Sequence, residues 1–195
     1  MPEVAVPVEY VVNSETGLIE PALQRPSPNF DARPDATDPD CIILHGISLP
    51  PGEFGGGQIE SLFLNQLDWD EHPYFAEIRG LEVSAHLLIR RDGELLQFVS
   101  FNERAWHAGE SCLLGRKRCN DYSIGIELEG QDSEPYTPRQ YDRLAEIIGL
   151  LLKVFPGLSR RNIVGHCDTS PGRNTDPGPA FDWLALYERL DTVPT

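Results

Sequence analysis

The sequence predicts an α/β fold, a single domain in which helices flank a mixed central β-sheet. Strand-like and helix-like segments alternate along the chain, which is typical of a sheet packed against helices. A hairpin candidate interrupts the alternation, so we expect a mixed sheet rather than a wholly parallel one. The 195 residues, 40% of them hydrophobic and 24% charged, are enough for one such domain with its own core.

We expect an N-terminal arm over residues 1–25 and a catalytic domain over residues 26–190. The chain up to about residue 40 is rich in Pro, Asp and Asn. Pro26 and Pro28 exclude a helix interior there, because each lacks a backbone donor and restricts the residue before it. This part is therefore predicted to be extended chain packed over the domain.

The first half of the domain is expected to hold a strand, a loop and a helix. Cys41–His45 is a short apolar run with β-branched residues, typical of a buried strand ending at His45. Residues 49–57 read Leu-Pro-Pro-Gly-Glu-Phe-Gly-Gly-Gly, which predicts a loop. Residues 59–67 have the apolar spacing of a helix. His45 should thus stand where a strand meets a loop.

A hairpin is predicted over residues 84–100. Two apolar runs, residues 85–89 and 95–99, flank Asp92-Gly93. This pair is the one that a two-residue type I′ turn prefers.

The second half is expected to add two strands and two helices. Residues 122–129 alternate, so Ile124, Ile126 and Leu128 share one face of a strand and Glu127 lies on the other. Residues 163–166 predict a short strand and residues 181–190 a short helix.

The long helix between these strands carries a recognisable start. Thr137 fits the N-cap, Pro138 the first turn, and Gln140 can complete a capping box. Its apolar stripe comprises Tyr141, Leu144, Ala145, Ile148, Leu151, Leu152 and Phe155.

The charge balance narrows the possible partners. The formal net charge is −15, with 31 acidic and 16 basic residues, so nucleic acid and anionic membranes are disfavoured as partners. The N-terminus lacks the basic and apolar regions of a signal peptide, and no window is apolar enough to span a membrane. The four dispersed cysteines are expected to be reduced thiols, and together with the missing export signal they predict a cytoplasmic protein. We also expect a monomer.

Candidate metal ligands stand at two predicted strand ends. His45 and His166 end apolar runs, and Asp176 lies in a later loop where Pro177 stiffens the chain. Two imidazoles and a carboxylate are a normal ligand set for catalytic zinc, and Glu127 could move a proton nearby. From composition and spacing alone, a core histidine and a turn-capping aspartate explain these residues slightly better.

Several segments then show a resemblance to a known family. His45–Gly55, Val83–His86, Arg104–Gly109, Cys119–Gly130, Gly165–Asp168 and Thr175–Trp183 occur in the order and spacing of the AmpD family of 1,6-anhydro-N-acetylmuramyl-L-alanine amidases. The resemblance runs from about Pro26 to Trp183. It implies a zinc-dependent amidase fold related to peptidoglycan recognition proteins.

The resemblance also implies roles for individual residues. His45, His166 and Asp176 would bind one Zn²⁺, and Glu127 would take a proton from the attacking water and deliver it to the leaving alanine nitrogen. His86, Trp106 and His107 would shape the cleft. Arg118 matches an arginine that contacts the carboxylates of the peptide, although a solvated surface arginine explains it equally well.

Two positions depart from the family pattern. Asn174 stands where the family usually has a lysine that stabilises the oxyanion, and Gly46 stands where the family has asparagine. Asn174 is expected to donate an amide hydrogen bond in place of the lysine, with Arg173 as the other candidate.

The sequence therefore predicts an N-acetylmuramoyl-L-alanine amidase that cuts (1,6-anhydro)muropeptides during peptidoglycan recycling. The alternative is a catalytically impaired module that binds or senses muropeptides. The change to Asn174 favours the alternative, whereas the complete ligand set and Glu127 favour the enzyme.

Overall fold

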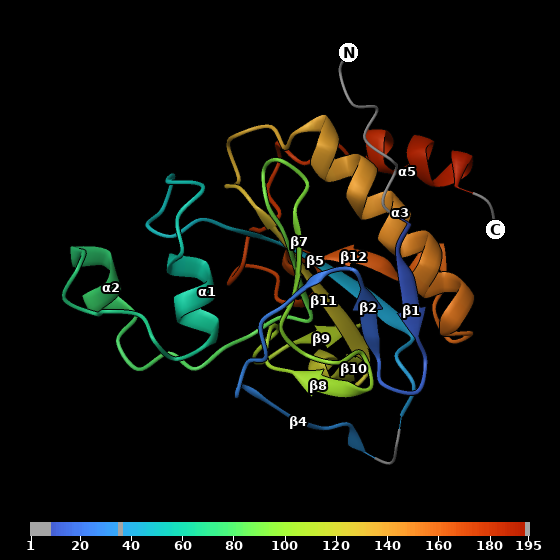
Figure 1. Ribbon diagram of the computed structural model, residues 1–195, viewed down its shortest axis with the longest axis horizontal. Coiled ribbons are helices and arrows are strands. Elements are labelled where there is room, and N and C mark those ends of the chain that lie inside the picture. The colour runs from blue at the N-terminus through green and yellow to red at the C-terminus, as the bar shows by residue number, and fades with distance from the viewer. Residues whose placement is uncertain (1–8, 35–36, 194–195) are drawn as a thin grey trace.

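The computed structural model describes residues 9–34 and 37–193 and has a six-stranded central sheet (Figure 1). Its strand order is β12-β5-β11-β6-β7-β3. Neighbouring strands are parallel except for β6 and β7, which form an antiparallel hairpin. The strands are β12 (Ile163–Gly165), β5 (Cys41–Ile47), β11 (Ser123–Glu129), β6 (Leu87–Ile89), β7 (Leu95–Gln97) and β3 (Leu23–Gln24). The predicted mixed sheet is confirmed.

Helices lie on both sides of this sheet, so the predicted arrangement of layers is also confirmed. The long helix α3 (Pro138–Val154) and α5 (Trp183–Thr192) pack together and share one hydrophobic cluster with the sheet. The short helices α1 (Gln58–Phe63) and α2 (Pro73–Glu77) contribute to a second cluster, together with Leu88 and Leu96 of the hairpin.

Three short strand pairs and several short helical turns lie outside the central sheet and the two helix layers. Strand β1 (Val11–Asn13) pairs with β2 (Leu18–Glu20), β4 (Phe30–Ala32) with β8 (Glu103–Ala105), and β9 (Cys112–Leu113) with β10 (Arg116–Lys117). Two 3₁₀ turns, η2 (Cys119–Asp121) and η3 (Arg160–Asn162), precede β11 and β12. A single helical turn, α4 (His166–Thr169), follows β12.

Side chains of β11 point alternately to the two faces of the sheet, so one face enters the hydrophobic core and the other carries Glu127. Ile124, Ile126 and Leu128 are fully buried in the cluster beneath α3. Burying a side chain of this size stabilises the fold by roughly 1.5–3 kcal/mol. Glu127 lies on the opposite face, as the sequence predicts, and is therefore turned away from α3.

The predicted start of α3 is confirmed in detail. The Thr137 hydroxyl accepts a hydrogen bond from the Gln140 backbone N–H, and the Gln140 side chain accepts one from the Thr137 N–H. The hydroxyl also donates to the carbonyl of Arg91 at 2.7 Å, which joins the helix to the hairpin loop. The cap therefore fixes α3 against the sheet.

The hairpin is confirmed, but its predicted type I′ turn is wrong. That turn needs positive φ at both central residues, and Gly93 has φ of 88° whereas Asp92 is not among the positive-φ residues. The Gly93 N–H donates to the carbonyl of Arg90, and the Arg90 N–H to that of Glu94. These bonds define a three-residue loop that ends in a left-handed glycine, so the backbone needs only one residue of special conformation.

Some element boundaries also differ from those predicted. Helix α1 ends at Phe63, because the chain turns at Asn65 with φ of 58°. His166 begins helix α4 instead of ending a strand, and the Asp168 carboxylate accepts the Gly165 N–H at 2.8 Å. Helix α5 starts at Trp183, after an Asp182 N-cap.

The arm is partly built into the domain. Ile19 is fully buried in the main cluster, and β3 adds an edge strand to the sheet. Residues 1–8 lie outside the described part. The division between arm and domain at residue 25 stays a prediction.

The four cysteines are free thiols. Within the described ranges, no helix has both the length and the apolar composition needed to cross a bilayer.

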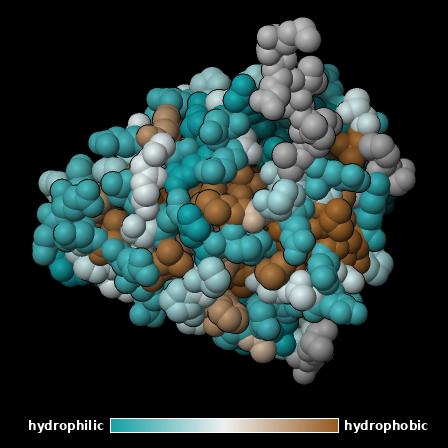
Figure 2. Space-filling view, in the orientation of Figure 1, coloured by the Kyte–Doolittle hydropathy of each residue, from teal (hydrophilic) through white to brown (hydrophobic). Residues whose placement is uncertain are grey.

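The surface is largely polar on the face seen in Figure 2. Figure 2 shows one face of the molecule as mostly hydrophilic, with hydrophobic residues reaching the surface in separate patches.

We predict that Thr137→Ala lowers the free energy of unfolding by about 1 kcal/mol, because it removes an N-cap acceptor. Urea unfolding of the purified protein measures this difference. Thr137→Ser is the matched control, since it keeps the hydroxyl and should stay close to wild type. Equal loss in both variants would contradict a capping role.

Candidate active site

The parallel pairing of β5 and β11 brings the first two site residues together. In this register His45 lies directly opposite Glu127. Side chains of paired residues project from the same face of a sheet, so the imidazole and the carboxylate face the same side. Both are almost completely buried. The two strands therefore supply a rigid base for the site.

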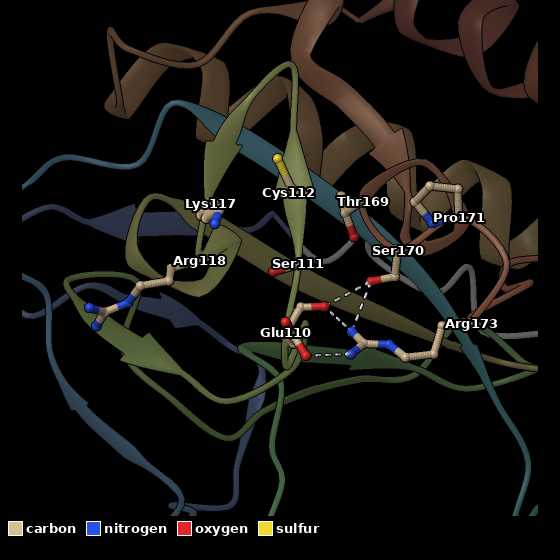
Figure 3. Close-up of a pocket in the computed structure, with 9 residues that line it drawn as sticks. All are labelled: Glu110, Ser111, Cys112, Lys117, Arg118, Thr169, Ser170, Pro171 and Arg173. Carbon is tan, nitrogen blue, oxygen red and sulfur yellow. Dashed lines mark hydrogen bonds and ion pairs between the residues drawn. The ribbon is translucent and has the colours of Figure 1, made fainter.

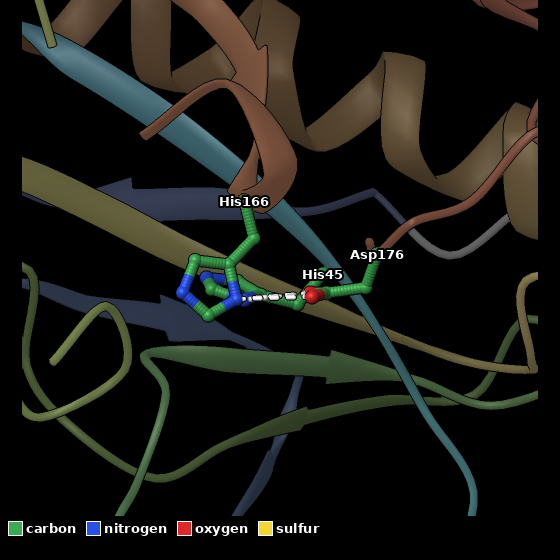
Figure 4. A group of neighbouring side chains, drawn as sticks. All are labelled: His45, His166 and Asp176. Carbon is green, nitrogen blue, oxygen red and sulfur yellow. Dashed lines mark hydrogen bonds and ion pairs between the residues drawn. The ribbon is translucent and has the colours of Figure 1, made fainter. Parts of the chain in front are cut away.

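Two segments that follow β12 complete a cluster with His45. His166 comes from the first turn of α4, and Asp176 from the irregular chain that follows it (Figure 4). The Asp176 carboxylate lies 3.1 Å from His45 Nδ1 and 3.0 Å from His166 Nδ1. The ligand atoms of all three residues lie within 4.8 Å of one another. The structure thus brings together the three predicted metal ligands.

The protonation states of this cluster suit a metal ion. Burial lowers the pKa of His45 despite the nearby carboxylate, so its imidazole is held neutral. Burial acts to raise the pKa of Asp176, but hydrogen bonds to His166 and His45 outweigh it and hold the pKa well below its usual range. A neutral imidazole and an ionised carboxylate are the forms that metal binding requires.

Glu127 differs from its neighbours because nothing holds its charge. Burial raises its pKa well above the ordinary value, and the negative charge of Asp176 adds to this rise. Among the described residues, its Oε2 is the only buried side-chain nitrogen or oxygen without a hydrogen-bond partner. A buried, unpartnered carboxylate beside a cluster of ligand atoms is typical of a group that exchanges a proton with substrate or water.

These groups open onto a cleft of about 240 Å³. One wall is apolar and comes from α1 and α2, with Leu62, Phe63, Tyr74 and Ile78. The other end is polar and contains His45, His107, Glu127, His166, Asn174 and Asp176. Larger hollows lie elsewhere, but within the described part of the chain the group of candidate metal ligands lies only here. The cleft can therefore take a ligand with an apolar part and a polar, reactive part.

The three residues expected to shape the cleft fall in different places. His107 lines it, with Nδ1 3.0 Å from His45 Nε2. His86 is fully buried behind it, accepts the Gly125 N–H at Nδ1, and is not among the lining residues. Trp106 also does not line the cleft. Only His107 is thus placed where it can act on the cluster.

Asn174 lines the cleft beside the second histidine. Its amide nitrogen lies 3.1 Å from His166 Nε2, the ring nitrogen that faces away from Asp176. Arg173 points elsewhere and donates to the Glu110 carbonyl. Of the two candidates for the missing lysine, only Asn174 faces the cluster.

Arg118 and Arg173 line opposite sides of another hollow of about 450 Å³, in which Glu110 lies against Arg173 (Figure 3). Arg118 is 70% exposed in its side chain and pairs with Asp121 at 3.1 Å. Lys117 lines the same hollow. Three cationic side chains in one hollow suit an anionic group, although the protein as a whole is acidic.

Tyr136 is a site residue that sequence reasoning missed. Its hydroxyl donates to the Pro177 carbonyl at 2.9 Å, next to the candidate ligand Asp176. A Cβ atom on Gly46 would stand 2.2 Å from this hydroxyl. Gly46 therefore leaves the room that Tyr136 occupies, and a glycine directly after a candidate ligand is the signal that could have revealed the close approach.

The fold and the site together define a single-domain α/β protein with a candidate metal centre suited to hydrolysis. The chain matches the model of the N-acetylmuramoyl-L-alanine amidase family over residues 35–179, and it belongs to this family. The predicted resemblance is thus confirmed.

Relatives of known sequence and structure agree with this assignment. The chain is 55% identical over 169 residues to the 1,6-anhydro-N-acetylmuramyl-L-alanine amidase AmpD of Escherichia coli (strain K12), covering 87% of this chain and 92% of that protein. Identity to AmpD of Haemophilus influenzae is 50%, with the same coverage. A crystal structure of a selenomethionine AmpD derivative superposes with a TM-score of 0.88 at 51% identity, covering 90% of this chain and 97% of the other.

A more distant structure contains a substrate. The complex of E. coli AmiD with anhydro-N-acetylmuramic acid-L-Ala-D-γ-Glu-L-Lys has a TM-score of 0.57 and 27% identity, and covers 82% of this chain and 60% of that one.

We predict that Glu127→Gln stabilises the chelator-treated protein at neutral pH. The folded-state pKa of Glu127 lies above its ordinary value of 4.5, so the folded state binds the proton more tightly than the unfolded chain does. Wild-type stability should therefore fall as pH rises above about 4.5, whereas the neutral amide lacks this loss.

Unfolding free energies measured in urea from pH 4 to 8 check this expectation. Glu188→Gln is the matched control, because Glu188 is exposed and should show no such difference. A gap between Glu127→Gln and wild type that does not widen with pH would contradict the assignment.

Proposed function

We propose that this chain is a zinc-dependent amidase that hydrolyses the bond between the lactyl group of (1,6-anhydro)muramic acid and L-alanine. The observation that carries the proposal is the unpartnered carboxylate of Glu127 beside His45, His166 and Asp176. The identity to AmpD relatives supports the anhydromuropeptide as substrate and peptidoglycan recycling as the context. A cytoplasmic location and a monomeric state stay predictions from the sequence.

The ligand set supports zinc. Two imidazole nitrogens and a carboxylate oxygen, with room for a water or substrate, are the usual arrangement in catalytic zinc sites. When bound, Zn²⁺ would polarise the lactyl carbonyl and lower the pKa of a water molecule.

Glu127 acts as the general base and then as the general acid of the reaction. Its carboxylate receives the proton of the attacking water and passes it to the alanine nitrogen as the amide bond breaks. Burial raises its affinity for the proton, so the proton is retained until the leaving nitrogen takes it. The neighbouring apolar wall of α1 and α2 limits the access of bulk water to this exchange.

Asn174 can accept a hydrogen bond from His166 and donate another to the substrate. The Asn174 amide nitrogen lies 3.1 Å from His166 Nε2, and a half-turn of the amide brings its oxygen to this position, where it accepts the Nε2–H. The NH₂ group then turns away from His166 and can donate to the developing oxyanion. A neutral donor thereby replaces the lysine found in the family.

The cationic hollow receives the carboxylates of the stem peptide. Arg118 and Arg173 line it, and guanidinium groups suit carboxylates because they can form two parallel hydrogen bonds.

We predict that the purified protein releases peptide from anhydro-muramyl tripeptide, that a chelator abolishes release, and that added Zn²⁺ restores it. Mass spectrometry of the released peptide measures the reaction. Glu127→Gln should lose roughly 10²- to 10⁴-fold in turnover, the usual contribution of a positioned acid–base group. Wild-type turnover in Glu127→Gln would exclude the proposed proton path.

The same assay tests the alternative of a binding module, which the change to Asn174 favours. A folded, zinc-loaded protein that binds the muropeptide without releasing peptide would support that alternative and contradict the enzyme.

We predict that Asn174→Ala lowers kcat by about 10²- to 10³-fold with a smaller change in KM, because an oxyanion donor acts mainly in the transition state. Steady-state kinetics separate the two constants. Thr175→Ala is the matched control, because Thr175 is an exposed neighbour outside the cleft lining. Unchanged kcat in Asn174→Ala would remove Asn174 from the reaction.

A further inference from the structure

The apolar wall of the cleft depends on a short helix that has little stability of its own. Helix α1 has only six residues, and its N-cap Gly57 supplies no side-chain acceptor. Isolated helices shorter than about 12 residues are marginal in water, so contacts with the rest of the domain must fix α1. Leu62 and Phe63 of this helix line the cleft, so the position of α1 decides the position of the wall.

The segment that leads into α1 offers few side chains that could anchor it. Residues 55–57 are three consecutive glycines, and Gly55 has φ of 80°. A hollow of about 510 Å³ opens beside this segment, and its lining includes the three glycines, Glu60, Arg90 and Glu129. Polar contacts with the backbone therefore have to hold the segment in place.

Glu129 anchors the glycine segment to β11. It lies two residues after Glu127, so both side chains project from the same face of the strand. Glu129 is fully buried, and its carboxylate accepts the Gly55 N–H at 2.6 Å and the Arg91 N–H at 3.1 Å. Glu127, in contrast, leaves Oε2 without a partner. Of the two carboxylates, Glu127 is free to exchange a proton and Glu129 holds the chain.

Arg90 joins three segments through one guanidinium group. Its Nη1 donates to the Gly56 carbonyl at 2.8 Å and to Glu129 Oε1 at 3.2 Å, and its Nη2 donates to Glu60 Oε1 at 2.6 Å. Arg90 is only 8% exposed, so water competes weakly for these bonds. Arg25 of the arm pairs with the other carboxylate oxygen of Glu60 at 2.9 Å. The first turn of α1 is thus tied to the hairpin and to the arm.

The contacts of Glu60 also fix the opposite side of α1. Leu62 and Phe63 belong to the hydrophobic cluster that α1 shares with α2, which stands beside it (Figure 1). A shift of the helix that separates Glu60 from Arg90 would also move these two side chains in the cleft. Arg90, Glu60 and Glu129 do not line the cleft themselves. They can therefore affect a ligand only through the helix and the glycine segment.

We propose that Arg90, held by Glu129, is a positioning residue that fixes the apolar wall of the cleft and thereby sets the affinity for the substrate. It acts through α1 and residues 55–57 and does not touch the reacting groups. The inference rests on the proposed function in taking the cleft as the site that binds the muropeptide.

The first test measures KM and kcat of Arg90→Lys with anhydro-muramyl tripeptide. Lysine keeps the positive charge beside Glu129, but it lacks the planar fork that reaches Gly56, Glu129 and Glu60 together. KM should rise roughly tenfold, the low end of the cost of one lost methylene contact in a hydrophobic pocket. The kcat should stay close to wild type, because the wall contacts ground state and transition state alike. Unchanged kinetics, or a fall in kcat at constant KM, would overturn the proposal.

Arg143→Lys is the matched control. Arg143 also joins a glycine carbonyl, that of Gly93, to a glutamate, Glu146, but it lies on α3 and does not line the cleft. Its replacement should leave KM unchanged even where it lowers stability. An equal rise of KM in both variants would show a general effect of lost ion pairs and contradict a positioning role for Arg90.

The second test uses Glu60, whose side chain is 21% exposed and can be removed without leaving a buried cavity. Glu60→Ala should raise KM as Arg90→Lys does. Glu60→Gln should recover much of this loss, because its amide oxygen can still accept from Arg90. Wild-type KM in Glu60→Ala would contradict the proposal.

Hydrogen exchange of the zinc-loaded protein without substrate shows whether the wall itself is loosened. Backbone amides of residues 53–63 should exchange faster in Arg90→Lys than in wild type, whereas those of α3 should not change. Unchanged exchange over residues 53–63 would also overturn the proposal.

Failure of the proposed function would look different. The wild type would then release no peptide, and the same variants would be compared by the Kd for the tripeptide, measured by calorimetry. A wild type that neither binds nor cuts the tripeptide would overturn both proposals. Failure of the positioning role alone would leave the wild type active and would appear only in the variants, as unchanged KM and unchanged exchange.

Discussion

The site depends on the parallel pairing of β5 with β11. This pairing runs over seven residues of each strand and sets His45 opposite Glu127. A shift by one residue would turn one of the two side chains toward α3. The opposite face prevents such a shift, since Ile124, Ile126 and Leu128 must remain in the hydrophobic cluster. The packing of α3 therefore fixes the geometry of the chemistry on the other side of the sheet.

Burial then gives the site residues their chemical character. It keeps His45 and His107 neutral and raises the proton affinity of Glu127. Asp176 keeps its charge because two histidines bind its carboxylate. One environment thus holds imidazoles neutral, a carboxylate ionised and a second carboxyl group with raised proton affinity, depending on which partners each group finds.

A buried arginine supports the segment that leads into β11. The Arg33 guanidinium donates to the backbone carbonyls of Phe101, Asn120, Asp121 and Ser123, and burial lowers its pKa to about 10. It thereby ties the chain after β4 and the chain before β8 to the start of β11. The two departures from the family also have local consequences, since Asn174 contacts His166 and Gly46 makes room for Tyr136.

The sequence alone determined those features that depend on local pattern. Alternation along 122–129 placed Glu127 away from the core, and Thr137 with Gln140 marked the start of α3, because strand period and helix capping involve neighbours in the chain. The expectation that His45, His166 and Asp176 bind zinc came from the family resemblance, since composition and spacing left these residues undecided.

Only the tertiary structure decided how distant residues pair. The contacts of His107 with His45, of Asn174 with His166 and of Tyr136 with Pro177 join segments from separate loops and strands. The turn at Gly93 and the end of α1 likewise follow from backbone conformations that several sequences permit. Such contacts are fixed by the packing of the whole domain, which no single stretch of the sequence contains.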